Sequence, residues 1–201
     1  MCSGPLLASV ISSRRLLPTR IVNAALESDI LGNDCPTCGA DTDALGRALP
    51  PPQPDGYLNP AVAVDAVCIR TIESEVEVLM ITRTLPPGEG LLALPGGFVE
   101  YGEDPEDAVL RELVEETGCV GILGDILCVR GDPQRDPRKH IVSIVYRVDV
   151  EPQAIPQAGD DAADAGWFSL PELLGQSERV AFDHRDILAI LSETLLAPST
   201  Q

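Results

Sequence analysis

Runs of apolar residues alternate with polar turns from residue 57 onward. Residues 61–70 (AVAVDAVCIR) and 75–82 (EVEVLMIT) are short, rich in β-branched side chains, and separated by a polar turn. Such runs predict two consecutive β-strands. Similar runs predict strands over residues 120–130, 141–150 and 165–169.

Residues 104–118 carry the clearest helix pattern in the chain. Asp104 is suited to the N-cap, and Pro105 fits the first helical position. Gly118 is suited to end the helix, because glycine readily adopts the left-handed conformation found there. Apolar residues that can face a core recur between these ends: Ala108, Leu110, Leu113 and Val114.

Residues 171–174 and 184–196 predict a short helix and a final longer one. Two short apolar stretches, 91–94 and 98–100, flank a pair of glycines at positions 96 and 97. Strands interspersed with helices indicate the α/β (α+β) class.

The first 55 residues differ in character from the rest. Residues 1–26 contain three Arg and no acid, which is typical of an organellar transit peptide, although an ordinary tail fits the same residues. The proline-rich stretch at residues 50–54 reads as a spacer. We therefore expect an N-terminal extension over residues 1–55 and one domain over residues 56–201.

The six cysteines bear on compartment and metal binding. Cys35 and Cys38 have the CxxC spacing of half a zinc site, but a lone pair lacks the other two ligands, and a surface turn is the simpler interpretation. Cys68, Cys119 and Cys128 lie in or beside apolar runs, where free buried thiols are common. We expect a reducing, cytoplasmic location, or a mitochondrion or plastid if residues 1–26 are a transit peptide.

Charge and hydropathy restrict the partners. The chain has 32 acidic and 14 basic residues, for a net charge of -18. A field of this sign repels nucleic acid and anionic membranes, so we expect neither as a general partner. No stretch reaches the ~18 apolar residues of a membrane helix.

Three acids in the predicted helix form the main candidate site. Glu112, Glu115 and Glu116 have the i, i+3, i+4 spacing that places side chains on one helical face. A solvated acidic face is one interpretation. The other is a site for a hard divalent cation such as Mg²⁺, which prefers oxygen ligands and would also use carbonyls of the glycine pair.

The segment from Gly97 to Cys119 resembles the Nudix box, G-x5-E-x7-R-E-U-x-E-E-x-G-U, where U is a bulky aliphatic residue. Its invariant positions are filled by Gly97, Glu103, Arg111, Glu112, Glu115, Glu116 and Gly118. Cys119 occupies the last aliphatic position, as a small hydrophobe can. The wider resemblance covers residues 57–191 and implies an α/β/α sandwich around a mixed sheet, with the box as loop–helix–loop.

The resemblance also implies a reaction. Nudix enzymes hydrolyse a nucleoside diphosphate linked to another moiety, with Mg²⁺ or Mn²⁺ as cofactor. By position in the box, Glu112, Glu115 and Glu116 would be metal ligands, together with the Gly96 carbonyl. Arg111 would orient the glutamates, and Glu103 would bind metal or brace the loop through Arg111.

Segments near the box resemble ADP-ribose pyrophosphatases, which form AMP and ribose 5-phosphate. In that interpretation Gly97, Arg135 and Arg138 contact the substrate, although residues 135–140 also suit a plain hairpin turn. Asp160 or, preferably, Asp161 would supply an extra acid as general base or as a further metal ligand. The other interpretation of these two residues is a polar loop.

Two alternatives remain open at this point. The substrate would instead be 8-oxo-dGTP, another nucleoside triphosphate, NADH, FAD or a dinucleoside polyphosphate. The domain would otherwise be a non-catalytic sensor of a small nucleotide ligand. The resemblance is also compatible with a homodimer.

Overall fold

The computed structural model describes residues 33–34, 41–42, 57–159 and 162–197. The chain divides into two units, Met1–Leu49 and Pro50–Gln201. In the first unit, strands β1 (Asn33–Asp34) and β2 (Asp41–Thr42) pair antiparallel. The expected transit segment (1–26), the turn from Cys35 to Cys38 and the spacer at 50–54 lie outside the described residues.

The strands of the second unit form two four-stranded sheets. One has the order β7-β3-β9-β8, and only its β3–β9 pair is parallel. Its strands are β3 (Ala61–Val67), β7 (Gly96–Phe98), β8 (Gly121–Arg130) and β9 (Ile141–Val150). The other sheet has the antiparallel order β10-β5-β4, with β6 also paired to β5. Its strands are β4 (Ile69–Ile72), β5 (Glu75–Arg83), β6 (Leu92–Ala93) and β10 (Ala162–Ser169).

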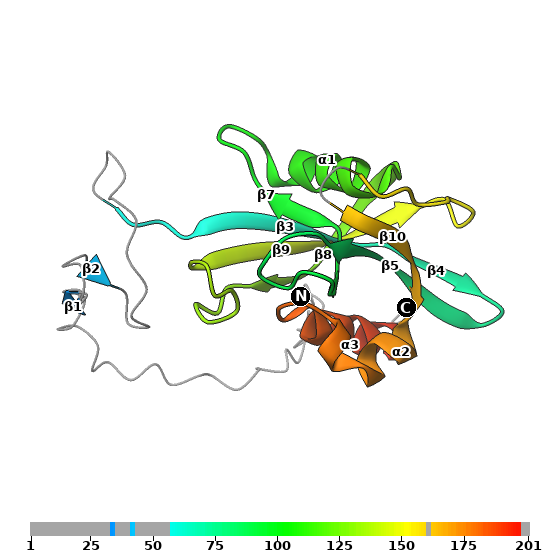
Figure 1. The fold of residues 1–201 in the computed structure, drawn as a ribbon. Coiled ribbons are helices and arrows are strands. Elements are labelled where there is room, and N and C mark those ends of the chain that lie inside the picture. The colour runs from blue at the N-terminus through cyan, green and yellow to red at the C-terminus, as the bar shows by residue number, and fades with distance from the viewer. Residues whose placement is uncertain (1–32, 35–40, 43–56, 160–161, 198–201) are drawn as a thin grey trace, which may run out of the picture. The chain divides into compact units, whose positions relative to one another are not determined.

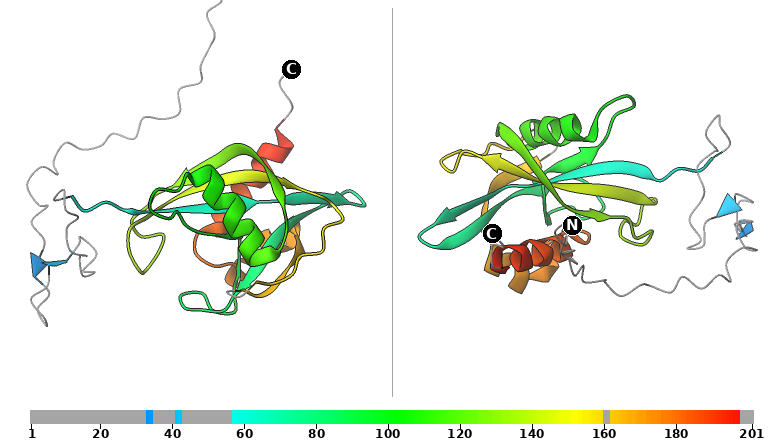
Figure 2. Two further views of the ribbon diagram at one scale, coloured as in Figure 1. Left: turned by 90° about the horizontal axis from the view of Figure 1, so that it is seen from above. Right: turned by 180° about the vertical axis from the view of Figure 1, so that it is seen from behind.

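Helices cover both sides of the strands. Helix α1 (Pro105–Thr117) lies on one side, and α2 (Leu170–Gly175) and α3 (His184–Leu196) lie on the other (Figure 1; Figure 2, right). The 3-10 helix η1 (Ser177–Arg179) joins α2 to the segment before α3. The predicted α/β/α sandwich is therefore confirmed, with the strands divided between two sheets.

Successive residues of β3 contribute to two different cores because side chains alternate across a strand. Val64 and Ala66 pack under α1 with Val109 and Leu113. Val67 belongs to the core that packs under α2 and α3. One charged residue, Asp65, interrupts this apolar strand and is nevertheless buried. A buried carboxylate requires partners, which are described below with the site.

Most predicted elements agree with the structure, and one differs. Strand β9 and helix α3 have the predicted bounds. The expectation of one strand over residues 61–70 is wrong, because the chain leaves β3 at Cys68 and enters the other sheet as β4. Residues 69–72 pair with β5 through a tight turn at Glu73 and Ser74, both with positive φ. An apolar run cannot show this change of sheet, because both halves are apolar strands.

The helices of the described residues are too short or too polar to cross a lipid bilayer.

Candidate active site

Helix α1 is fixed at both ends by the residues that its sequence predicts. The Asp104 carboxylate accepts a hydrogen bond from the Glu106 N–H at 3.0 Å, and Pro105 opens the first turn. Gly118 ends the helix with φ of 66°, and its N–H donates to the Val114 carbonyl. The buried side chains Ala108, Val109 and Leu113 hold one face of the helix against the strands.

Arg111 connects the acids of the box. Its guanidinium donates two hydrogen bonds to Glu103, at 2.8 and 2.9 Å, and a further one to the Phe98 carbonyl. It also donates to Glu112 at 2.8 Å and to Glu115 at 3.0 Å. The two hydrogen bonds from Arg111 lower the pKa of Glu103 to about 2. A bidentate, charge-assisted contact of this kind also fixes the orientation of the guanidinium. Arg111 thus occupies the position expected of it among the box glutamates.

Glu116 contacts the glycine pair that opens strand β7. Its carboxylate accepts a hydrogen bond of 2.8 Å from the Gly96 N–H. The pKa of Glu116 is raised to about 8, chiefly by burial. The neighbouring carboxylates of Glu112 and Asp65 act in the same direction, and the Gly96 N–H and Arg83 oppose the rise. Burial also raises the pKa of Glu112. These carboxylates therefore lie where negative charge is poorly compensated, which is the environment that a cation would relieve.

Gly97 explains why the box begins with glycine. A Cβ atom at this position would lie 2.3 Å from Glu112 Oε1 and 2.6 Å from its Oε2. The Glu112 carboxylate therefore occupies the space that any other residue would fill. At Gly96, a Cβ would lie 2.2 Å from the Val64 carbonyl oxygen of the neighbouring strand β3. Two adjacent glycines thus let strand β7 approach both strand β3 and the Glu112 side chain.

A cleft of about 380 Å³ opens beside this glycine pair. Its lining includes Arg111, Glu112 and Glu116 of the box, together with Thr84, Leu85 and Glu100. A second hollow of about 110 Å³ contains Arg135, Arg138 and Phe182. The two hollows share four lining residues: Arg83, Gly96, Gly97 and Phe98. The two hollows therefore meet at the glycine pair of strand β7.

Arg83 is a site residue that the sequence interpretation missed. It ends strand β5, lines both hollows, and is the cation that opposes the raised pKa of Glu116. Its guanidinium donates to the Pro87 carbonyl at 3.0 Å and lies 4.9 Å from the Phe182 ring centre. An arginine at the end of an otherwise apolar strand was the available signal.

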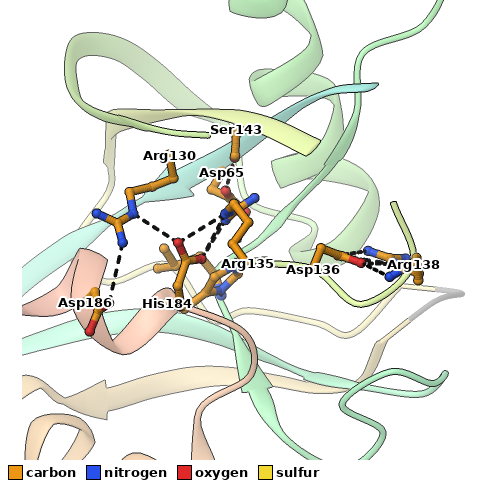
Figure 3. A network of polar contacts seen from close by, with 10 residues as sticks. Asp65, Arg130, Arg135, Asp136, Arg138, Ser143, His184 and Asp186 are labelled. Carbon is orange, nitrogen blue, oxygen red and sulfur yellow. Dashed lines mark hydrogen bonds and ion pairs between the residues drawn. The ribbon is translucent and has the colours of Figure 1, made fainter. Parts of the chain in front are cut away.

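The two arginines predicted to contact substrate are paired with acids. Arg135 is almost fully buried and forms a two-pronged pair with Asp183, whose carboxylate also accepts from Arg130 (Figure 3). Arg138 is more exposed and forms a two-pronged pair with Asp136 (Figure 3). Both line the smaller hollow, so their predicted role in substrate binding stays a prediction.

A buried polar network lies behind the glycine pair. Asp65 accepts a hydrogen bond from the Ser143 hydroxyl, and its Oδ1 lies 3.6 Å from His184 Nε2 (Figure 3). His184 Nδ1 accepts from the Leu94 N–H at 2.9 Å, so the proton of the neutral ring is on Nε2, toward Asp65. Burial lowers the pKa of His184, which favours this neutral form. Helix α3 is thereby connected to the segment that leads into Gly96.

The acid predicted as general base, Asp161, lies outside the described residues, as does Asp160. Gly159, which precedes them, donates its N–H to the Glu116 carbonyl at 3.1 Å. A Cβ on Gly159 would lie 1.7 Å from the Glu115 carbonyl oxygen. The residues before Asp160 therefore contact the end of the box helix directly.

The donor set fits a hard divalent cation. It consists of carboxylates and the Gly96 carbonyl, which are the oxygen ligands that Mg²⁺ and Mn²⁺ prefer. In the side-chain arrangement described, Glu112 and Glu115 instead pair with Arg111. Among the described residues, no three or more acidic, His or Cys side chains surround one point as a finished metal site. The chemistry fits, and these pairings must rearrange to complete the site.

Residues 59–191 match the NUDIX domain family. An ADP-ribose pyrophosphatase of Methanocaldococcus jannaschii is 46% identical over 132 residues, which cover 66% of this chain and 73% of that protein. The ADPR responsive transcriptional repressor NtrR of Acinetobacter baylyi is 29% identical over 138 residues. That match covers 68% of this chain and only 54% of the repressor.

The fold has a similar counterpart among solved structures. The NUDIX domain of Shewanella oneidensis NrtR in complex with ADP ribose is 30% identical, with a TM-score of 0.64. The match covers 71% of this chain and 93% of that domain. The chain belongs to the Nudix family, as its box predicts.

Proposed function

We propose that this protein is a pyrophosphohydrolase that cleaves ADP-ribose into AMP and ribose 5-phosphate with Mg²⁺, or alternatively Mn²⁺. One observation carries the proposal. Gly97, Arg111, Glu112 and Glu116 of the box line one cleft, in a chain that is 46% identical to an ADP-ribose pyrophosphatase. The 380 Å³ of the cleft suits one nucleotide-sized ligand.

The residues of the box divide the work. Glu112, Glu115 and Glu116 would hold the cation together with the Gly96 carbonyl, and Arg111 would orient these glutamates through its five donors. Glu103 fixes Arg111 from the opposite side with its two-pronged contact. A bound divalent cation would supply Lewis-acid stabilisation of the phosphoryl oxygens and would acidify a water molecule.

The neighbouring residues bind and orient the diphosphate. Arg83 lies between the two hollows, so its guanidinium is placed to neutralise a diphosphate that crosses the glycine pair. Gly97 leaves room for Glu112 and lets the substrate approach the backbone. Asp161 remains our candidate for the base that takes the proton from the attacking water.

Product analysis tests this function directly. The purified protein is incubated with ADP-ribose, NADH, FAD, a dinucleoside tetraphosphate or 8-oxo-dGTP, with Mg²⁺ or with a chelator. We expect AMP to form fastest from ADP-ribose and only with the cation. Faster turnover of another substrate would overturn the choice of ADP-ribose while leaving Nudix chemistry in place.

The alternative is a sensor that binds ADP-ribose without cleaving it. The similarity to an ADPR responsive repressor favours this second candidate. The intact glutamates of the box oppose it, because a sensor has no need of all three. Tight ADP-ribose binding without any AMP formation in Mg²⁺ or Mn²⁺ would establish the sensor and overturn the enzyme.

A further inference from the structure

Aromatic rings are scarce in this chain, and two of them converge on one hollow. The sequence contains only three phenylalanines. Phe98 and Phe182 both line the smaller hollow, although 84 residues separate them in the chain. Phe98 is 38% exposed and follows the glycine pair directly, while Phe182 is half-buried just before helix α3. Hydrophobic burial alone does not explain a partly exposed ring here.

Cations are equally concentrated around these two rings. The guanidinium carbon of Arg138 lies 5.7 Å from the Phe98 ring centre and 5.6 Å from that of Phe182. Lys139 Nζ lies 4.3 Å from the Phe98 ring centre, and Arg83 faces Phe182. Three of only 14 basic residues in a chain of net charge -18 thus surround two phenylalanines.

The charges of this group are partly compensated. Asp136 neutralises Arg138 through its two-pronged pair, and Asp183 does the same for the neighbouring Arg135. A site built only for phosphate would leave such guanidinium groups open to the anion. The group also offers flat surfaces: two aromatic rings and a planar guanidinium held in place by a carboxylate. Such surfaces bind a nucleobase by stacking.

We propose that Phe98, Phe182 and Arg138 form the subsite for the adenine ring of the substrate, and thereby set its orientation in the cleft. The inference rests on the proposed function, because it assigns the two halves of ADP-ribose to two ends of one cleft. The adenosine half lies in the smaller hollow, and its diphosphate crosses Gly96 and Gly97 beside Arg83. The ribose 5-phosphate half, which has no aromatic ring, lies in the larger hollow beside the box glutamates.

The decisive experiment compares the two products as ligands. Calorimetry measures the binding of AMP and of ribose 5-phosphate to the wild-type protein, Phe98→Leu and Phe182→Leu, in Mg²⁺. Leucine keeps the apolar volume and removes the ring. Phe182 has a positive φ of 53°. Leucine also carries a Cβ atom, so the substitution does not relax this backbone conformation as glycine would. We expect AMP to bind about 5- to 30-fold more weakly to each variant, as for a lost base–ring stack. Binding of ribose 5-phosphate should change less than twofold, by about the measurement error.

Tyr101→Leu is the matched control. Tyr101 is a fully exposed aromatic residue that follows Phe98 closely in the chain, and it lines neither hollow. It should leave the binding of both products unchanged. Equal weakening of AMP in Tyr101→Leu, or unchanged AMP binding in both Phe variants, would overturn the subsite.

The experiment separates this inference from the proposed function. If wild type hydrolyses ADP-ribose but AMP binding ignores both Phe substitutions, the function holds and the adenine subsite is overturned. If wild type does not hydrolyse ADP-ribose but the Phe variants still weaken AMP binding selectively, the subsite holds and the function is overturned. In kinetics, the expected signature of the Phe variants is a raised KM for ADP-ribose with kcat nearly unchanged.

Discussion

The two ends of the cleft are built in opposite ways. At the acidic end, one face of helix α1 supplies Glu112, Glu115 and Glu116. The first two pair with Arg111, and Glu116 accepts a hydrogen bond from the Gly96 N–H. At the other end, the side chains come from separate segments: Arg83 ends β5, Phe98 ends β7, Arg138 precedes β9 and Phe182 precedes α3. The acidic end is local in sequence, while the basic and aromatic end exists only in the folded chain.

This difference separates chemistry from specificity. The local end supplies what every pyrophosphate hydrolysis needs, namely oxygen ligands and a means of orienting them. The assembled end presents rings and cations whose identity changes with a few loop residues. Variants at the acidic end should therefore change kcat, and variants at the assembled end should change KM.

The largest effect is expected from Glu116→Gln. The variant removes a proposed cation ligand, so kcat for ADP-ribose should fall about 10²- to 10³-fold, as when one preorganised electrostatic group is lost. The fold should persist, because the pKa of about 8 favours the neutral carboxyl at pH 7 and glutamine resembles that form. Steady-state kinetics across a Mg²⁺ titration measures the loss. Glu106→Gln, exposed on the first turn of the same helix, should retain full activity.

Gly97→Ala tests how tightly the acidic end is packed. The new Cβ would displace the Glu112 carboxylate, because its oxygens lie within 2.6 Å of that position. A displacement of about 1 Å should lower kcat about 10²-fold, while the melting temperature changes little because a flexible side chain yields. Gly175→Ala is the control, since nothing lies within 4 Å of its new Cβ. Full activity of Gly97→Ala would contradict the assigned role of Glu112.

Arg83→Gln tests the junction between the two ends. Loss of one charge-assisted contact to a diphosphate should raise KM about 10-fold and leave kcat within about twofold. Initial rates over a range of ADP-ribose concentrations separate the two constants. The control is Arg185→Gln, an exposed position of α3. It removes the same positive charge as Arg83→Gln and should leave KM unaltered. A fall in kcat without a change in KM would place Arg83 in the chemical step instead.

The smallest effect concerns stability and pH. His184 is buried, and burial lowers its pKa, although Asp65 and Asp183 oppose this while Arg135 and Arg83 add to it. Below pH ~6.5 the unfolded chain therefore binds a proton that the folded chain resists, so stability should fall as the pH decreases. His184→Asn keeps an acceptor for the Leu94 N–H and removes the titration. Melting temperatures are measured at about pH 7.5 and about pH 5.5, roughly one unit either side of the ordinary histidine pKa. The melting temperature of His184→Asn should change less between these two pH values than that of wild type.

A second substitution at the same position separates titration from hydrogen bonding. His184→Leu leaves the buried Leu94 N–H without its acceptor and should cost about 1–3 kcal/mol at every pH. If wild type and His184→Asn respond identically to acid, His184 does not set the pH response.

The sequence predicted what is encoded by neighbours along the chain. The cap at Asp104 and the left-handed end at Gly118 follow from residue types and spacings within one helix and its ends. The contact of Arg111 with the glutamates was expected only from the resemblance to the Nudix box. The same reasoning failed at Cys68, where an uninterrupted apolar run passes between two sheets.

The rest of the site could not be predicted because it depends on contacts between distant residues. Asp65 reads as a polar interruption of a strand until Ser143 and His184 are brought beside it. The sequence likewise does not show that Arg135 pairs with Asp183, 48 residues later. Which of two arginines in one loop is buried, and which faces the rings, is decided only by folding.

One further consequence follows from the composition of the basic and aromatic end. Lys139 is the only lysine in the sequence, and its Nζ lies over the ring of Phe98. An amine-reactive reagent therefore has a single side-chain target in the whole chain, at the rim of the cleft. The molecule carries its own labelling site, through which occupancy of the cleft can be followed by mass or fluorescence without introducing a foreign residue.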